Sequence, residues 1–429
     1  MGDRTAKLTY DGGELEFPIV DGNDGNDGID VSTLRDTTGM VNLDYGFANT
    51  AATRSAVSSV NGVEGELSYR GYPIEQLAAN ATFLEVSYLL FHGELPSAQA
   101  LEDYTSIISN HTLLNEEMKR LFDAFPKSAH PMAILSSATN AMATFYPDFH
   151  NPTDPYAVEQ SALRLVAKLP TVAALAYKKS IGQPYIYPRN DLGYTENFLH
   201  MMFALPVKDY EVDPIVAKAL DVLLILHADH SQNCSTSTVR LVGSSQANLF
   251  TSVAAGMSAL WGPLHGGANQ RVVEMLSQIN EDGRDYSKYV ERAKDSDDPF
   301  RLWGFGHRVY KSFDPRARIL KDFAHEVMER MGGDDPLLDI ARKLEETALS
   351  DDYFIERDLY PNVDFYAGLV YRALGFPVRM FTVLFAIGRL PGWIAQWKEM
   401  SEDPDTRIGR PRQIYTGYGP RDYPTKTKA

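Results

Sequence analysis

The segment DPIVAKALDVLLILHADHSQNCSTSTVR, residues 213–240, indicates how this chain folds. Asp213 can cap a helix that begins at Pro214, a residue suited to the first helical position. Apolar residues then recur with the period of one helix face: Val216, Leu220 and Leu223. We expect His227 and His230 to share that inward face. The segment therefore predicts a buried helix that ends in two histidines.

The helical period covers most of the chain and predicts a mainly α fold. It begins near residue 75, and its long stretches are 75–93, 131–145, 154–182, 195–205 and 213–230. Asp314-Pro315 marks another helix start. The stretch 243–259 has eleven Gly, Ala, Ser or Thr among seventeen residues. Such a helix can pack closely against a neighbour, either within the subunit or across a subunit boundary.

Only the beginning of the chain has a β pattern. KLTY (7–10) and ELEF (14–17) alternate polar and apolar residues on either side of Asp11-Gly12-Gly13, and Asn61-Gly62 marks a second hairpin. The acidic loop at 21–30 lacks the ligand spacing of a calcium loop. We expect a polar loop there, within a small β-rich segment at 1–60.

Composition and charge exclude several classes of protein. The 429 residues carry 41 Lys and Arg against 57 Asp and Glu, a net charge of −16, which disfavours binding to nucleic acid or anionic membranes. The single cysteine, Cys234, favours a reducing, cytoplasmic setting. No secretory signal is legible in the first twenty residues, and the apolar run 380–387 is shorter than the roughly 20 residues of a membrane span. The last 25 residues invert the charge to +4, typical of an anion-binding tail or a solvated end.

The stretch GPLHGGANQ, residues 262–270, places His265 among glycines just before a predicted helix. A helix N-terminus disfavours an imidazolium, so a neutral His265 could donate a hydrogen bond to a developing oxyanion. An ordinary turn histidine is the alternative. His227, His230 and His265 could also hold a metal in a hydrolase, but no HExxH motif or cysteine pair completes a ligand set.

A third histidine lies in a cationic turn. In GFGHRVYKSFDPRAR, residues 304–318, two glycines frame His307, and Lys311 and Arg316 follow it. Arg316 at a helix start favours an anionic ligand. A solvated charge run is the alternative.

One carboxylate is a candidate general base. In YPNVDFYAG, residues 360–368, Asn362 can cap a helix with Asp364 in its first turn. Acids are common there because of the helix dipole. As a base, Asp364 would need partial desolvation to hold its pKa in a useful range.

Six motifs together resemble citrate synthase, in that family's order and spacing. They are HADHSQNCSTSTVR, GPLHGGANQ, GFGHRVYKSFDPRA, PNVDFYAG, FAIGRLPGW and RPRQIYTG. The resemblance runs from about residue 40 to 421. It implies a two-domain, mainly α fold with a large domain at 61–270, completed by 383–429, and a small domain at 271–382. The segment 1–60 resembles the N-terminal extension of a bacterial branch and disfavours the alternative, a 2-methylcitrate synthase acting on propionyl-CoA.

The resemblance also implies the reaction. Acetyl-CoA would be condensed with oxaloacetate and citryl-CoA hydrolysed to citrate and CoA, without a metal or other cofactor, by a homodimer or a dimer-based hexamer. Asp364 would remove a methyl proton, His265 would hydrogen-bond the thioester oxygen, and His307 would polarise the ketone. The implied oxaloacetate ligands are His230, Arg316, Arg389 and, from the other subunit, Arg410. Lys311 would contact CoA phosphates.

Some bacterial members bind NADH at a separate site, and this chain matches that pattern in part. The matching residues are His111, Thr112, Tyr146, Arg164, Lys168 and Asn190. Asn110 stands where the pattern has an arginine, and Val207 stands where it has a cysteine. We therefore expect a vestigial nucleotide site with weakened binding.

Overall fold

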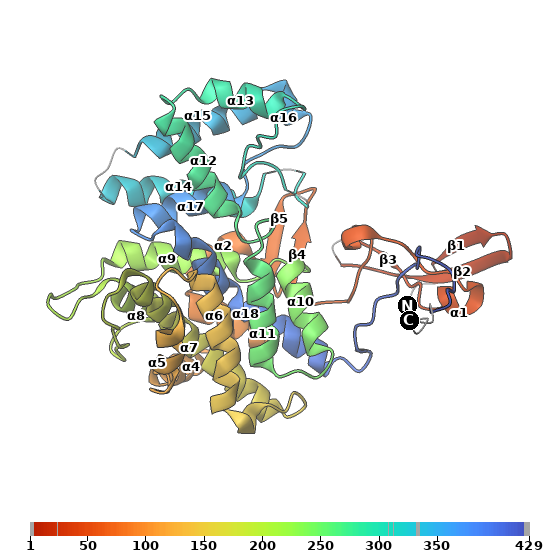
Figure 1. Cartoon of the computed structure of the whole chain (residues 1–429), viewed down its shortest axis with the longest axis horizontal. Coiled ribbons are helices and arrows are strands. Elements are labelled where there is room, and N and C mark those ends of the chain that lie inside the picture. Colours follow the sequence, from red (N-terminus) through yellow and green to blue (C-terminus); the bar gives the residue numbers. More distant parts are fainter. Residues whose placement is uncertain (1–3, 24, 308, 312, 332–334, 424–429) are drawn as a thin grey trace, which may run out of the picture. The chain divides into compact units, whose positions relative to one another are not determined.

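The computed structural model describes residues 4–23, 25–307, 309–311, 313–331 and 335–423. The chain divides into two compact units, one formed by Met1–Arg54 and Ile408–Ala429 and the other by Ser55–Arg407. Helices dominate, as the sequence predicts (Figure 1). The predicted domain boundaries at 60/61, 270/271 and 382/383 stay predictions.

The first unit contains the predicted N-terminal hairpin. Strands β1 (Thr5–Tyr10) and β2 (Gly13–Val20) are antiparallel, and β3 (Gly28–Ile29) pairs with the end of β2. The short helix α1 (Leu34–Thr38) and the 3-10 turn η1 (Tyr45–Phe47) follow. In the acidic loop, Asp21 and Asp27 both form ion pairs with Arg4 at 2.8 Å. These two carboxylates therefore serve to close the loop.

The second unit begins with a small antiparallel sheet and continues in helices. Its strands are β4 (Ser58–Asn61), β5 (Glu66–Tyr69) and β6 (Tyr72–Pro73), which confirms the second hairpin. Its first helices are α2 (Ile74–Asn80), α3 (Phe83–His92), α4 (Ala98–Asn110), α5 (Met118–Ala124), α6 (Pro131–Met142), α7 (Pro155–Ile181), α8 (Tyr194–Phe203), α9 (Pro214–His227), α10 (Cys234–Gly243) and α11 (Leu249–Leu260). Then come α12 (Ala268–Glu281), α13 (Tyr286–Lys294), α14 (Pro315–Met331), α15 (Pro336–Ser350), α16 (Asp352–Ile355), α17 (Val363–Ala373) and α18 (Phe381–Glu402). Helices α12 to α17 gather in the upper part of Figure 1, above α3 to α11.

Three helices depart from their predicted bounds, and side-chain caps explain two of these differences. The stretch 75–93 forms two helices, because Thr82 and Glu85 form a capping box that begins α3. The stretch 243–259 is not one helix, because Asn248 caps α11 at Leu249. Helix α11 packs against α6, α10 and α18 of the same chain, and its packing across a subunit boundary stays a prediction. Helix α9 ends at His227, so the expectation that His230 lies on its inward face is wrong.

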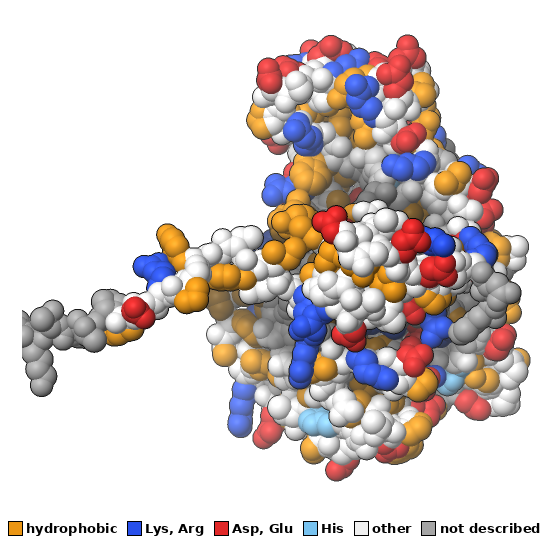
Figure 2. All heavy atoms as spheres, turned by 90° about the vertical axis from the view of Figure 1, so that its right-hand side faces the viewer, with side chains coloured by type: hydrophobic (Ala, Val, Ile, Leu, Met, Phe, Trp, Pro, Cys, Tyr) orange, Lys and Arg blue, Asp and Glu red, His pale blue; other side chains and the backbone are white. Residues whose placement is uncertain are grey.

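Helix α18 lies at the centre of the second unit. It packs against α3, α7, α9, α10 and α11. The apolar stretch Val378–Glu402 is longer than the sequence suggested and could cross a membrane by length and composition, but 89% of it is buried inside the fold, as in a core helix. On the face shown in Figure 2, acidic and basic side chains are interspersed over the second unit.

Two glycines let α18 approach the end of α9 closely. A Cβ at Gly388 would lie 3.1 Å from the backbone oxygen of Leu224, and one at Gly392 would lie 2.1 Å from that of Ala228. The N–H of Gly392 donates a hydrogen bond to this Ala228 oxygen over 3.1 Å. The two backbones are therefore in direct contact beside His227 and His230.

Candidate active site

The loop after α9 positions His230. Its neighbour Asp229 is buried and accepts hydrogen bonds from Ser58 of β4 and from the N–H of Ser231. The His230 ring lies 5.3 Å from the His307 ring between centroids, and its Nε2 lies 3.2 Å from the hydroxyl of Tyr310. The structure thus brings together two histidines that are 77 residues apart in the sequence.

His265 is held by the N-terminus of a helix, although not the predicted one. Its Nε2 accepts a hydrogen bond from the N–H of Ser235 over 3.2 Å, and the Ser235 hydroxyl lies 2.8 Å from the same atom. Ser235 lies in the first turn of α10, whereas the sequence suggested the helix that follows His265, α12. Burial, with a contribution from the charge of Arg389, lowers the pKa of His265 to about 4. The ring is therefore neutral at physiological pH, with its proton on Nδ1.

His307 lies in a turn that glycine makes possible. Gly304 and Gly306 have φ values of +85° and +76°, and a Cβ at Gly304 would also lie 2.8 Å from a Val272 methyl. The His307 Nδ1 accepts hydrogen bonds from the N–H groups of Val309 and Tyr310 over 3.0 and 3.2 Å. Burial and the charge of Arg316 lower its pKa to about 4. This leaves a neutral ring with a proton on Nε2.

Asp364 lies in the first turn of α17, as predicted. Asn362 caps this helix by accepting from the N–H of Asp364 over 3.0 Å. The Asn362 side-chain amide also donates to the backbone oxygen of Gly306 over 2.9 Å, which ties the cap to the His307 turn. Burial raises the pKa of Asp364 to about 6, against the opposing charges of Arg316 and Arg389.

Two buried arginines lie among these side chains. Arg316 forms a bidentate pair with Asp314, with distances of 3.0 and 2.9 Å, and Asp314 also accepts from the N–H of Val363. Arg389 of α18 donates through Nε to the backbone oxygen of His227 over 2.6 Å. Burial lowers the pKa of Arg389 to about 10, so both guanidinium groups stay charged at neutral pH.

Together these side chains form one candidate site. The charges of both arginines act on the pKa values of His230 and Asp364, while Arg316 acts on His307 and Arg389 acts on His265. The site therefore combines a weakly acidic carboxylate, neutral imidazoles and two fixed positive charges. Such a set can move a proton, stabilise an oxyanion and hold a dicarboxylate.

Comparison with known proteins identifies the family of this chain. The family described as "Citrate synthase, C-terminal domain" matches residues 46–412. The chain belongs to the citrate synthase family. It is 59% identical to citrate synthase 1 of Mycobacterium tuberculosis over 423 residues, which is 99% of this chain and 98% of that protein. It is 54% identical to the Corynebacterium glutamicum citrate synthase over 413 residues, covering 96% and 94%.

A solved structure of a citrate synthase also has this fold. The ternary complex of the Thermoplasma acidophilum citrate synthase with carboxymethyl coenzyme A and oxaloacetate matches with a TM-score of 0.81 and 28% identity, over 89% of this chain and 98% of that one. The names of these relatives do not favour the alternative of a 2-methylcitrate synthase.

Two other residues implied by the likeness to citrate synthases are exposed. Arg410 is exposed and belongs to the first unit. Lys311 is exposed, and only its backbone N–H has a recorded partner, the oxygen of Gly62. Their proposed roles therefore depend on the partner subunit and on CoA.

The residues of the expected nucleotide site lie close together. The Arg164 guanidinium stacks over Tyr146 and Phe149 at 5.1 and 4.4 Å, and Lys168 donates to the backbone oxygens of His111 and Leu113. The Asn190 amide donates to Asn110 over 3.1 Å. Burial and Arg164 lower the pKa of Lys168 to about 8. Val207 is 89% exposed, with no contact recorded to this cluster.

Among the residues that the structure describes, there is no ligand set for the alternative of a metal-dependent hydrolase. His227 Nδ1 lies 2.7 Å from the Leu223 oxygen, while the Nε2 atoms of His230 and His265 contact Tyr310 and Ser235. Within the described ranges, no group of three or more His, Cys, Asp or Glu could hold a metal ion. The described residues therefore give no support to a metal centre built from these three histidines.

Sequence reasoning missed three residues that position the site. Ser235 binds His265, Tyr310 contacts His230 and His307, and Asp314 holds Arg316. The pattern Asn233-Cys234-Ser235 before a helix could have indicated the first, since asparagine is a strong N-cap.

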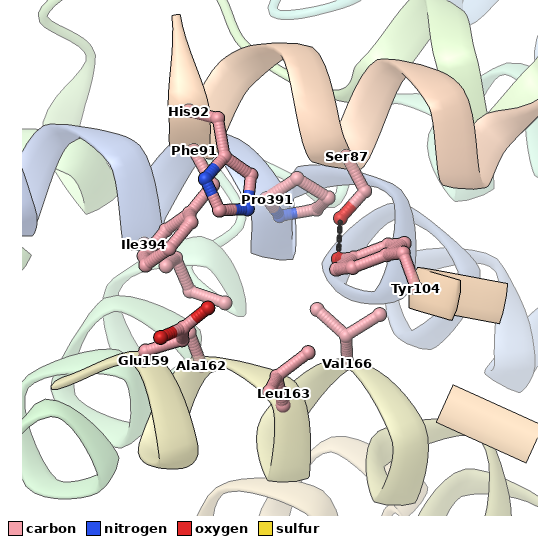
Figure 3. Close-up of a pocket in the computed structure, with 10 residues that line it drawn as sticks. All are labelled: Ser87, Phe91, His92, Tyr104, Glu159, Ala162, Leu163, Val166, Pro391 and Ile394. Carbon is pink, nitrogen blue, oxygen red and sulfur yellow. Dashed lines mark hydrogen bonds between the residues drawn. The ribbon is translucent and has the colours of Figure 1, made fainter. Parts of the chain in front are cut away.

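A small cavity lies on another side of α18, away from these side chains (Figure 3). It is bounded by α3, α4, α7 and α18. Ser87 and Tyr104 hydrogen-bond to each other over 2.9 Å on one side, and Glu159 lies on the opposite side. None of the implied catalytic residues lines this cavity.

Proposed function

We propose that this enzyme condenses acetyl-CoA with oxaloacetate and hydrolyses citryl-CoA to citrate and CoA, the first step of the tricarboxylic acid cycle. The observation that carries the proposal is that the charges of two buried arginines act on Asp364, while Arg389 also acts on His265 and Arg316 also acts on His307. An acid–base reaction on a thioester beside a dicarboxylate needs this combination of groups.

Asp364 acts as the general base. A pKa of about 6 leaves the carboxylate ionised at neutral pH yet more basic than an exposed aspartate. It takes a proton from the methyl group of acetyl-CoA. His265 donates Nδ1–H to the thioester oxygen as negative charge develops there, because its Nε2 is occupied by Ser235.

His307 acts on oxaloacetate. Its Nε2–H donates to the ketone oxygen, which gains a proton as the carbon–carbon bond forms. His230, Arg316 and Arg389 bind the carboxylates of oxaloacetate, together with Arg410 of the partner subunit. Planar guanidinium groups suit this role because they match carboxylate geometry. Lys311 contacts a CoA phosphate.

The assembly is a homodimer or a dimer-based hexamer in the cytoplasm, with no metal or redox cofactor. Exposed apolar side chains support a subunit interface near α10 and the α11–α12 loop: Leu241, Trp261 and Leu264, which are 51%, 42% and 96% exposed. A small domain at 271–382 closes over a large domain at 61–270 and 383–429, and the segment 1–60 precedes them.

A thiol-release assay tests the proposal. Purified protein should release CoA from acetyl-CoA only when oxaloacetate is present, and much faster than from propionyl-CoA. Equal rates with propionyl-CoA would favour 2-methylcitrate synthesis. The absence of oxaloacetate-dependent thiol release would contradict the proposal.

A further inference from the structure

Three buried polar atoms, one of them in Asp364 itself, have no hydrogen-bond partner among the residues that the structure describes. They are Oδ1 of Asp364, Nε2 of His227 and the hydroxyl oxygen of Tyr371. Leaving a buried polar atom without a partner costs about 1 to 3 kcal/mol, so such atoms are rarely left unsatisfied in native proteins. Three of them in one region indicate a shared partner.

Helix geometry brings Tyr371 toward Asp364. Tyr371 follows Asp364 by seven residues on α17, which is two turns and the same helix face. A long helical side chain leans toward the helix N-terminus, so the tyrosine hydroxyl extends back toward the aspartate. Of the residues between them on this face, Ala367 is small, whereas the backbone oxygen of Asn269 and a Val273 methyl would lie 2.8 Å from a Cβ at Gly368.

The side chain of His227, at the end of α9, lies near Tyr371. Its ring centroid lies 6.4 Å from that of Tyr371. The charge of Asp364 contributes, after burial, to raising the pKa of Tyr371, as expected for groups that lie near each other. Helices α9 and α17 therefore meet near the Tyr371 ring.

The hydrogen-bonding capacity of the three groups does not balance. His227 Nδ1 lies 2.7 Å from the Leu223 carbonyl, which can only accept, so Nδ1 carries the proton and Nε2 accepts. The Asp364 carboxylate also accepts. Tyr371 has one donor for two acceptors. A single water corrects this, because it can accept from the tyrosine and donate to both other groups.

We propose that Tyr371 is a positioning residue for the catalytic base, acting through one ordered water that it shares with His227 Nε2 and Asp364 Oδ1. A hydrogen bond donated to a carboxylate favours its ionised form. The tyrosine and the water therefore oppose the effect of burial and keep Asp364 able to accept a proton at lower pH. They also fix the rotation of the carboxylate.

Other charged groups face Asp364 and stay in place when Tyr371 is changed. They are Asp314 and Arg316, before and within α14, and Arg389 of α18. On the α15 side, Glu345 is paired with Lys321 and accepts from Tyr366. The effect of the tyrosine hydroxyl can thus be isolated by one substitution.

The test is the pH profile of Tyr371→Phe, which keeps the ring and removes the hydroxyl. We expect the acid limb of kcat/KM for acetyl-CoA to move to higher pH by about half a unit or more, which lowers the rate roughly threefold at a pH below the midpoint. The rate above pH 8 and the KM for oxaloacetate should change little. Tyr366→Phe is the matched control, since it removes a buried hydroxyl of the same helix that binds Glu345 over 2.6 Å. It should leave the acid limb in place.

The inference rests on the proposed role of Asp364, and the two can fail separately. An unmoved acid limb in folded Tyr371→Phe would overturn the inference, even if Asp364→Asn is inactive. An active Asp364→Asn would instead remove the proposed base. A crystal structure of the unaltered enzyme gives a second test. Density for one water within hydrogen-bond distance of Tyr371 and Asp364 supports the inference, and apolar packing of the tyrosine hydroxyl without such a water overturns it.

Discussion

The backbone N–H of Ser235 and the imidazole of His265 form a hydrogen bond that joins two segments 30 residues apart. Because the amide can only donate, His265 Nε2 must be unprotonated, and the ring proton is on Nδ1. The first turn of α10 thereby fixes the tautomer of His265. The proposed oxyanion donor is set before any substrate binds.

Replacing Asp364 by Asn should separate activity from stability. We expect turnover to fall by roughly 100-fold or more, because the amide cannot accept the methyl proton. Burial raises the pKa of Asp364 above its ordinary value, to about 6, so the folded state binds this proton more tightly than the unfolded state. The stability due to this proton is lost as pH rises from about 4 to 6, and Asp364→Asn should melt at a higher temperature at pH 7.5. Near-normal turnover would exclude Asp364 as the base.

The two active-site histidines should differ in their effect on oxaloacetate. His265→Ala and His307→Ala should both lower kcat strongly, since each removes a hydrogen bond made chiefly in the transition state. Only His307→Ala should weaken oxaloacetate binding markedly, because His307 lies beside His230. Calorimetry without acetyl-CoA measures this directly. Equal affinities in the two variants would contradict the division of roles.

The acid limb of the activity profile should have its midpoint near pH 6. Activity requires the ionised form of Asp364, whose pKa is about 6, whereas His265 and His307 have pKa values of about 4 and stay neutral across the limb. The rate should therefore fall with decreasing pH as one group is protonated. A midpoint near pH 4 would show that substrate or closure restores an ordinary carboxylate.

Mixed dimers can test whether Arg410 serves the neighbouring subunit. Arg410→Ala and Asp364→Asn homodimers should both be inactive. After subunit exchange, one site of each mixed dimer has an intact Asp364 and a partner's intact Arg410, so part of the activity should return. Exchange can be followed by mass spectrometry. Complete exchange without recovery would refute the shared site.

The nucleotide cluster should bind NADH weakly. Lys168 already donates to two backbone oxygens, and Asn110 is engaged with Asn190, so Arg164 is left as the main cation for a phosphate. Replacing a charged contact by a neutral one typically costs about 1.5 to 3 kcal/mol. We expect little inhibition below millimolar NADH and stronger inhibition in Asn110→Arg. Salt-sensitive inhibition of the unaltered enzyme at micromolar NADH would show that the remaining residues suffice.

Local sequence signals predicted much of the fold and the position of Asp364, the proposed base. Tertiary contacts determine the other features of the candidate site. The cap at Asp213, the hairpin at Asp11-Gly12-Gly13 and the Asn362 cap before Asp364 depend on neighbouring residues alone, and the structure confirms each. The start of α3 could also have been predicted, because Thr82 and Glu85 have capping-box spacing.

By contrast, the partner of His265 comes from a helix far earlier in the chain, which no local pattern specifies. The burial of Arg389 is equally invisible in the sequence, because it depends on how α18 passes the end of α9. Charge alone would place an arginine at the surface.

The contact between Gly392 and the Ala228 oxygen limits which substitutions the candidate site can accept. Arg389 lies one turn before this glycine and His230 lies two residues after Ala228, so one backbone contact sets the gap between two proposed carboxylate-binding groups. Any side chain at position 392 would push α18 and the His230 loop apart. On the proposed roles of Arg389 and His230, a residue that touches no substrate thus sets the spacing of the groups that hold the dicarboxylate, so a substitution there should alter which length of acid fits while both groups stay intact.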